Sequence, residues 1–108
     1  MTKVRIQKHN GSIVSVECDG HTGYGVEGED IVCSALSSIV QTAALGLMQV
    51  VGIDLDYEVR EEDGYLKFTL PPLSKERRRD ADMILNTLYL GIFDLHEGFS
   101  DFIELEVK

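Results

Sequence analysis

The sequence predicts a single α+β domain of element order ββαββαβ, with a mainly antiparallel sheet and two packed helices. Three observations predict it. The 108 residues, 44% of them hydrophobic, can bury one core, so residues 1–108 form one domain. Short segments that alternate between apolar and polar residues indicate strands, and two longer segments without that alternation indicate helices. Short turns between most neighbouring strands favour antiparallel pairing.

The first two predicted strands form a hairpin. Residues 2–7 and residues 13–19 each alternate between apolar and polar side chains. The pair Asn10-Gly11 between them is typical of a tight hairpin turn. Cys18 shares a strand face with valines, so we expect it to be a core residue.

A second hairpin, a helix and a last strand complete the predicted fold. Residues 54–60 and 65–70 flank an acidic turn that ends at Gly64, and a final strand covers residues 102–107. Ser74 stands where it can cap the N-terminal end of the second helix. Apolar residues recur at helical spacing in that helix, at Ala81, Ile84, Leu85, Leu88, Ile92 and Leu95.

The first helix is predicted from about Asp30 to Val51 and carries no charge after its first residue. That stretch is nominally long enough to span a bilayer. Its richness in Ser, Ala, Gly, Gln and Thr, and the acidic residues on both flanks, argue against a membrane helix. We therefore expect no membrane association, and a helix buried all round in a compact protein or dimer.

Charge and composition exclude several classes of function. A formal charge of −9 disfavours binding to nucleic acid or anionic lipid and favours a cationic partner. The N-terminal residues contain no apolar run of signal-peptide length, so we expect a cytoplasmic protein with reduced thiols. No CxxC pair occurs and the three histidines are scattered, so we expect neither a metal site nor a cofactor.

A glycine-rich segment between the second strand and the first helix suggests two kinds of chemistry. Gly23, Gly25 and Gly28 spell GxGxxG, which in nucleotide-binding proteins places a pyrophosphate at a helix N-terminus. Here the acidic residues within 27–30 occupy that place and would repel phosphate. The surrounding hairpins also differ from the parallel βαβ unit that such a site requires. A nucleotide site is therefore disfavoured.

Nucleophilic catalysis by a thiolate is the second chemistry. If the helix begins near Asp30, Cys33 lies in its first turn, where the helix dipole and free N–H groups favour a thiolate. His21 ends the preceding strand, and the intervening loop can bring its imidazole to the thiol. From spacing alone, the alternative stays open that Cys33 is a small core residue.

A polar stripe beside Cys33 adds to the catalytic interpretation. Asp30, Ser34, Ser37 and Gln41 recur at intervals of four, three and four residues, which places them on one helix face. On an otherwise uncharged helix such a stripe suggests the wall of a cleft. The alternative is that these hydroxyl groups bond back to helix carbonyls.

The segment from residue 20 to residue 37 resembles the signature of the bacterial ribosomal-processing cysteine protease family, Prp. The matching residues are Gly20-His21, then Gly28-Glu29-Asp30-Ile31-Val32-Cys33-Ser34, then Ser37. The sequence departs from the family pattern at Thr22 and Ser34, where the family usually has Ala. Both residues are small, so the departures concern local packing rather than the chemistry.

The resemblance implies that Cys33 is the nucleophile and His21 the general acid/base, with Asp30 as an orienting acid or a helix cap. Gly20, Gly23, Gly25, Gly28, Ser34 and Ser37 would then line the substrate site. It also implies a homodimer that removes a short N-terminal extension from large-subunit ribosomal protein number twenty-seven, cutting after an aromatic residue.

Two other functions stay open from the sequence. One is a non-catalytic, chaperone-like module that binds a basic ribosomal protein. The other is a redox-sensing thiol protein, which the lack of a second cysteine near Cys33 in the sequence disfavours.

Overall fold

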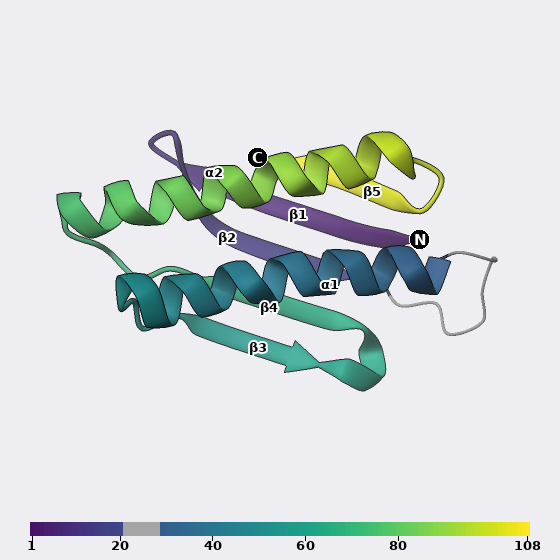
Figure 1. Cartoon of the computed structure of the whole chain (residues 1–108), viewed down its shortest axis with the longest axis horizontal. Helices are drawn as coiled ribbons and strands as arrows, with labels where there is room; N and C mark the ends of the chain where they lie inside the picture. The colour runs from purple at the N-terminus through teal and green to yellow at the C-terminus, as the bar shows by residue number, and fades with distance from the viewer. Residues whose placement is uncertain (21–28) are drawn as a thin grey trace.

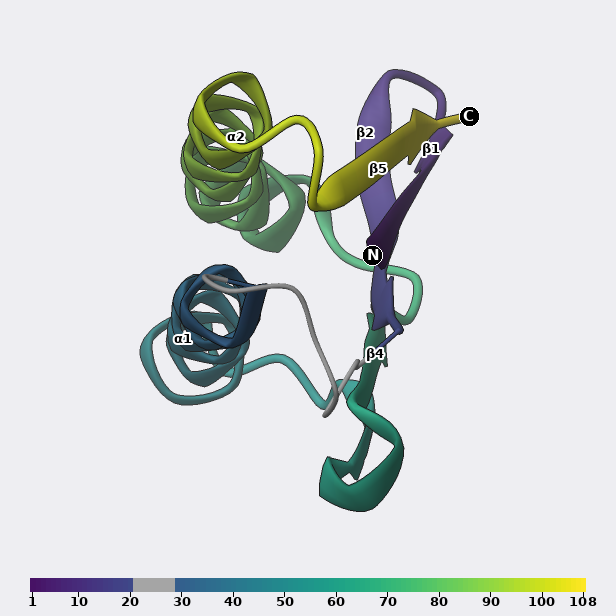
Figure 2. The same cartoon turned by 90° about the vertical axis from the view of Figure 1, so that its right-hand side faces the viewer.

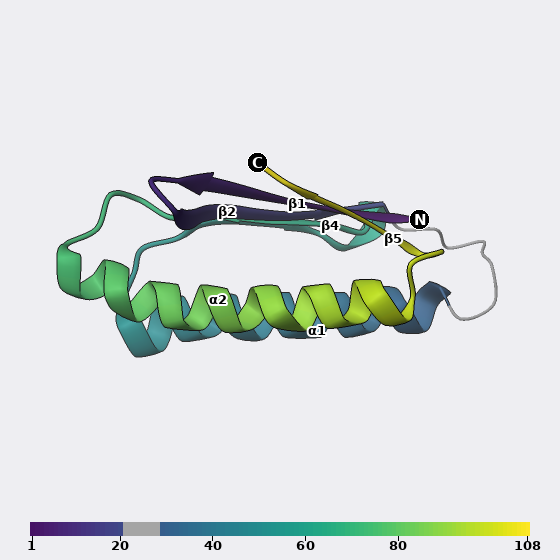
Figure 3. The ribbon, with the colours of Figure 1, turned by 90° about the horizontal axis from the view of Figure 1, so that it is seen from above.

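The computed structural model describes residues 1–20 and 29–108, and within them two helices lie side by side over one face of a sheet (Figures 1 and 2). Seen from above, the strands form one layer and both helices form the other (Figure 3). The elements are β1 (Thr2–His9), β2 (Ser12–Asp19), α1 (Glu29–Leu45), the π-helical turn η1 (Gly46–Val51), β3 (Asp56–Arg60), the 3₁₀ turn η2 (Glu61–Asp63), β4 (Tyr65–Thr69), α2 (Lys75–Gly98) and β5 (Ile103–Val107).

The described strands form one five-stranded sheet in the order β3-β4-β2-β1-β5. Neighbouring strands pair antiparallel from β3 to β1, whereas β5 pairs parallel to β1. The parallel pair follows from the connection, because α2 crosses over the sheet between β4 and β5. The predicted fold class and the order ββαββαβ are confirmed.

Local sequence signals set three of the element boundaries as predicted. Asn10 and Gly11 adopt left-handed φ angles of 51° and 82° in the turn between β1 and β2. Gly52 ends the first helical segment with φ 82°, and its N–H donates to the carbonyl of Leu47. The Ser74 side chain accepts a hydrogen bond from the backbone N–H of Arg77 and so caps α2.

The hydrophobic core fills the space between the sheet and the helix layer. Its largest fully buried side chains come from both layers, namely Phe68, Ile6, Leu36, Leu47, Leu85, Ile92 and Ile103. Two glycines bring the helices close together. An added Cβ at Gly46 would lie 3.4 Å from Ile84 Cδ1, and one at Gly91 would lie 3.4 Å from Ile39 Cδ1.

The expectation that the first helix is buried all round is wrong for a single chain. The segment Ile31–Val51 is apolar and long enough to cross a membrane, yet only 33% of its most apolar window is buried. Ile31 is 74% exposed and Val50 is 82% exposed. The reason is the two-layer architecture, because nothing in the described chain covers the outer face of the helices.

The face of the sheet away from the helices is polar and carries a network centred on Glu17. Its carboxylate accepts hydrogen bonds from Arg5 and from the Tyr65 hydroxyl, both at 2.7 Å. The Arg60 guanidinium lies over the Tyr65 ring, 4.1 Å from its centroid. The Tyr65 bond, followed by the Arg5 interaction, lowers the pKa of Glu17, and the bond to Glu17 raises the pKa of Tyr65 to about 12.

Candidate active site

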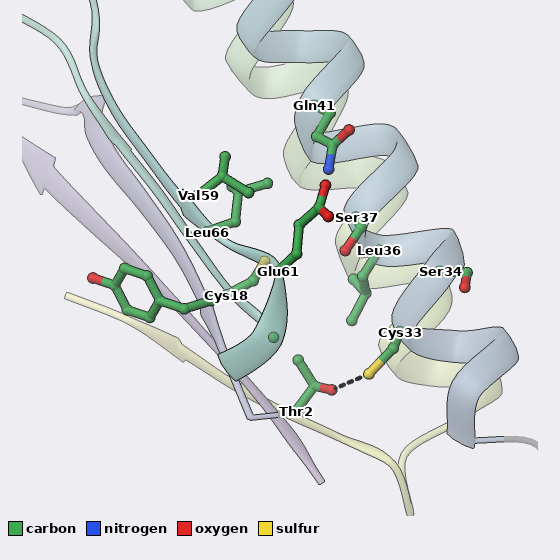
Figure 4. A pocket seen from close by; sticks show the side chains of 12 residues that line it. Thr2, Cys18, Cys33, Ser34, Leu36, Ser37, Gln41, Val59, Glu61 and Leu66 are labelled. Atoms are coloured by element: carbon green, nitrogen blue, oxygen red, sulfur yellow. Dashed lines mark hydrogen bonds between the residues drawn. The ribbon is translucent and has the colours of Figure 1, made fainter. Parts of the chain in front are cut away.

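A cleft of about 460 Å³ separates the first half of α1 from the β3–β4 hairpin, and Cys33 stands at one end of it (Figure 4). One wall comes from α1 and the other from β3, η2 and β4, with β1 and β2 at the base. The residues around it are Thr2, Cys18, Cys33, Ser34, Leu36, Ser37, Gln41, Val59, Glu61, Gly64, Tyr65 and Leu66. Since distant parts of the chain meet here, the cleft exists only in the folded protein.

The Cys33 thiol is half-buried and lies between two oxygen atoms. Its Sγ is 2.9 Å from the hydroxyl oxygen of Thr2 and 3.9 Å from the carbonyl oxygen of Gly20. Cys33 is the fifth residue of α1, so it stands just past the first turn rather than within it. The free N–H groups of the helix end lie one turn before the thiol.

The second thiol at the cleft has a different environment. Cys18 lies on the helix-facing side of β2 and is only 5% exposed, as expected for a core residue. Burial, with a smaller contribution from the charge of Cys33, raises the pKa of Cys18 to about 12. Cys18 therefore stays a neutral thiol near neutral pH. Cys18 and Cys33 are distant in the sequence, but both border this cleft, so Cys33 does have a second cysteine nearby in the fold.

The structure places the polar stripe of α1 at the cleft, as the helical spacing suggests. Ser34, Ser37 and Gln41 all border it, with Ser37 half-buried and the other two exposed. Figure 4 shows Ser37 and Gln41 on the side of α1 that faces Glu61. The backbone of Asp30 belongs to α1, but its side chain is not among those that the structure describes.

Several predicted site residues lie outside the described residues. These are His21 and the glycines Gly23, Gly25 and Gly28. Gly20 is described, and it sits against the thiol as the last residue before His21. The antiparallel pairing of β2 with β1 and β4 also differs from a parallel βαβ unit, which agrees with rejecting a nucleotide site.

Eight of the residues around the cleft were not predicted as site residues from the sequence: Thr2, Cys18, Leu36, Val59, Glu61, Gly64, Tyr65 and Leu66. A signal for Thr2 exists, because it shares the helix-facing side of β1 with Val4 and Ile6 and is a polar residue on an apolar face. Glu61 offers no such signal. It lies in an acidic turn, and only the folding of the hairpin against α1 brings it opposite Ser37 and Gln41.

Comparison with known proteins gives a consistent picture. A family model described as "Cysteine protease Prp" matches residues 1–104. The chain is 24% identical over 96 residues to the ribosomal processing cysteine protease Prp of Bacillus subtilis, covering 88% of this chain and 86% of that one. It is 22% identical over 98 residues to Prp of Staphylococcus aureus, covering 91% and 90% of the two chains.

Solved structures share the fold. The crystal structure of S. aureus Prp in complex with a substrate peptide superposes with a TM-score of 0.88 at 22% identity, covering 100% of both chains. A protein from Streptococcus mutans superposes with a TM-score of 0.87 at 27% identity, covering 99% of this chain and 93% of that one.

Proposed function

The chain belongs to the Prp family of cysteine proteases, and on that basis we propose that Cys33 is its nucleophile and His21 its proton-transfer partner. It is an enzyme of the ribosomal-processing type, a peptide hydrolase that uses a cysteine. The observation that carries the residue assignment is the contrast between two thiols at one cleft. Cys33 is half-buried and borders the cavity, whereas Cys18 is buried with a raised pKa.

The position of Gly20 supports His21 as the proton-transfer partner of the thiol. The carbonyl oxygen of Gly20 lies 3.9 Å from Cys33 Sγ, and His21 is bonded directly to that carbonyl group. Consecutive Cα atoms are about 3.8 Å apart, so the residue that follows Gly20 begins close to the described end of β2. This proximity supports His21 as the base. Asp30, in the first turn of α1, would either orient that imidazole or cap the helix.

The proposed reaction is acyl transfer to sulfur followed by hydrolysis. His21 takes the Cys33 thiol proton, and Sγ attacks the scissile carbonyl carbon. The C–N bond breaks and the leaving amine takes the proton from His21, which leaves a thioester. Water then hydrolyses the thioester, with His21 accepting its proton, and the thiol is restored. Gly20, Gly23, Gly25, Gly28, Ser34 and Ser37 are the residues proposed to contact the peptide.

The proposed substrate is the N-terminal extension of large-subunit ribosomal protein number twenty-seven, a basic protein. Glu61 is the one residue around the described cleft that carries a formal charge at neutral pH, and it has no ion pair there. Among the described lining residues, this carboxylate favours a lysine or arginine of the peptide. Val59, which is 42% exposed, offers apolar surface for an aromatic side chain next to the cut.

We further propose a cytoplasmic homodimer formed through the outer face of the helix layer. A groove of about 670 Å³ runs between α1 and α2 there, and its lining residues are uncharged: Ile39, Thr42, Ala43, Gly46, Met83, Ile84, Thr87, Leu88 and Gly91. In a protein of charge −9, this uncharged lining keeps like charges out of the contact when a second copy packs against it. A two-fold axis pairs such a surface with itself. Covering it also removes the reason to invoke a membrane for Ile31–Val51.

The test is mass spectrometry of the organism's own ribosomal protein, in its extended precursor form. The precursor is incubated with the reduced wild-type enzyme and with Cys33→Ala. One cut near the precursor N-terminus, absent with Cys33→Ala, supports the proposal. His21→Ala and Asp30→Ala then separate the two roles. A precursor left intact by folded wild type would favour a chaperone-like module that only binds a basic ribosomal protein.

A further inference from the structure

Thr2 is a buried polar residue whose hydroxyl touches the proposed nucleophile. It is only 4% exposed, and its Oγ1 lies 2.9 Å from Cys33 Sγ and 2.9 Å from the carbonyl oxygen of Gly20. Buried hydroxyl groups are retained where they find partners. Here one hydroxyl joins the start of β1, the end of β2 and the second turn of α1.

The hydrogen atoms available allow two arrangements of these bonds. A hydroxyl has one hydrogen to donate. While Cys33 is a thiol, the Thr2 hydroxyl donates to the Gly20 carbonyl, and the S–H donates to Thr2 Oγ1. A thiolate has no hydrogen and only accepts, so the hydroxyl rotates about its C–O bond and donates to sulfur instead. The thiol proton leaves to the base, and the hydroxyl keeps its own.

The backbone around Thr2 is built to hold this position. The N–H of Thr2 donates to the carbonyl of Phe102 at 2.9 Å, and Thr2 pairs with Ile103 in the parallel ladder. Gly20 has φ +111°, and a Cβ there would lie 2.6 Å from the carbonyl oxygen of Met1. Only glycine therefore allows β1 to approach so closely that the Gly20 carbonyl meets the Thr2 hydroxyl.

We propose that Thr2 is a positioning residue for catalysis: its hydroxyl holds Cys33 Sγ at the cleft and donates a hydrogen bond to the thiolate. This inference rests on the proposed function, in which Cys33 is the nucleophile. A hydrogen bond to a charged acceptor is about twice as strong as one between neutral groups, so its donor favours the reactive form. Before the thiolate forms, Thr2 contributes no binding energy to the peptide substrate, so its removal should affect kcat rather than KM.

The test compares Thr2→Val, which removes the hydroxyl at nearly constant shape, with Thr2→Ser, which keeps it. Cleavage of a peptide that spans the cut is followed at saturating and limiting concentrations. Thr2→Val should lower kcat by about tenfold, the loss expected when one hydrogen bond to a charged group is removed, with KM within about twofold of wild type. Thr2→Ser should stay within about threefold of the wild-type kcat.

A second measurement uses a small reagent in place of the peptide. The rate at which iodoacetamide alkylates Cys33 should fall in Thr2→Val and in Thr2→Ala, and recover in Thr2→Ser. Thr69→Val, a hydroxyl removed at the far end of β4, serves as the matched control and should change neither rate. Thermal unfolding of each variant shows what fraction of the protein is folded during the assays.

The outcomes are distinguishable from failure of the proposed function. If Cys33→Ala is inactive but folded Thr2→Val keeps the wild-type kcat, the role of Thr2 is overturned and the nucleophile stands. A Thr2→Ser enzyme as slow as Thr2→Val would also overturn it, because the hydroxyl would then not be the cause. If Cys33→Ala still cuts, the proposed function itself fails.

Discussion

The two faces of α1 use the uncharged stretch that follows Asp30 in opposite ways. One face presents Cys33, Ser37 and Gln41 to a cleft that is closed on its far side by the β3–β4 hairpin. The other face, with Ile39 and Ala43, borders an apolar groove that no described part of the chain covers. The absence of charge therefore has two origins. In the proposed function, small polar groups suit a cleft that takes a peptide, and apolar groups suit a face that takes a second copy.

This contrast explains why the helix resembles a membrane span in length and composition. The mean hydropathy of the segment combines both faces, so it reads as one apolar stretch. In the fold the two faces point to opposite sides of the helix. Gly46 in η1 and Gly91 in α2 let the helices pack closely, with a groove between them. Substitutions confined to one face should leave the other face intact.

The largest expected effect lies on the cleft face and separates the two cysteines. Cys33→Ala should abolish cleavage, a loss of at least about 10³-fold in kcat, because no other nucleophile stands at its position. Cys18→Ala should leave kcat within about threefold but lower the free energy of unfolding by about 1 kcal/mol, through a small core cavity. Peptide cleavage and urea unfolding measure both. Loss of cleavage in a stable Cys18→Ala protein would contradict this division of roles.

The next largest effect lies on the outer face. Met83 borders the groove and is 62% exposed in the single chain. Met83→Glu should weaken self-association by at least about a hundredfold, because each copy would bury an unpaired charge at the interface. Light scattering at micromolar concentration measures the mass. Val107→Glu, a similar change on β5, is the control and should leave the mass unchanged. Equal masses for wild type and Met83→Glu would place the interface elsewhere.

A smaller effect is expected from Glu61, the one charged residue around the described cleft. Glu61→Gln should lower kcat/KM for a lysine-containing peptide by up to about fivefold, the usual limit for an exposed ion pair. The effect should shrink as salt is added, since exposed charges are screened. Glu62→Gln, its exposed neighbour outside the cleft lining, is the matched control. A peptide with the lysines replaced by glutamine should be cut equally by all three enzymes, and any other result would remove Glu61 from substrate recognition.

The smallest effect lies on the face of the sheet away from the helices, at Glu17. The pKa of Glu17 is lower in the folded protein than its ordinary value of 4.5. Its carboxylate form therefore stabilises the fold above about pH 4.5, and that stabilisation is lost as the pH falls through the folded pKa. In Glu17→Gln, the free energy of unfolding should fall less between pH 7 and pH 3 than in wild type, by about 1 kcal/mol or less. Urea unfolding at a series of pH values measures it. Glu104→Gln, on the edge strand β5, is the control.

The same network predicts a change at high pH. Because the hydrogen bond to Glu17 raises the pKa of Tyr65 to about 12, its protonated form stabilises the fold below pH 10. That contribution disappears between about pH 10 and pH 12. Tyr65→Phe removes the hydrogen bond to Glu17, so it should also remove this dependence of the free energy of unfolding on pH. An unchanged alkaline limb in Tyr65→Phe would show that the network contributes nothing to stability.

The sequence by itself determined the order of elements and several of their boundaries, and its family resemblance indicated the class of chemistry. Alternation and turn residues such as Asn10-Gly11 are local signals, and local backbone preferences persist in the fold. Ser74 and Gly52 likewise mark helix ends through bonds to residues only a few positions away. The family signature around Cys33 is also contiguous, which is why it could be recognised in the sequence.

The tertiary structure alone decided what surrounds the thiol and which surfaces stay open. Thr2 is 31 residues from Cys33 in the chain, and their contact exists only because β5 and Gly20 fix the start of β1 beside α1. Glu61 reaches the cleft through the folding of a hairpin, and the outer groove exists because both helices cover one face of the sheet. Such contacts depend on long-range packing, which local sequence patterns do not encode.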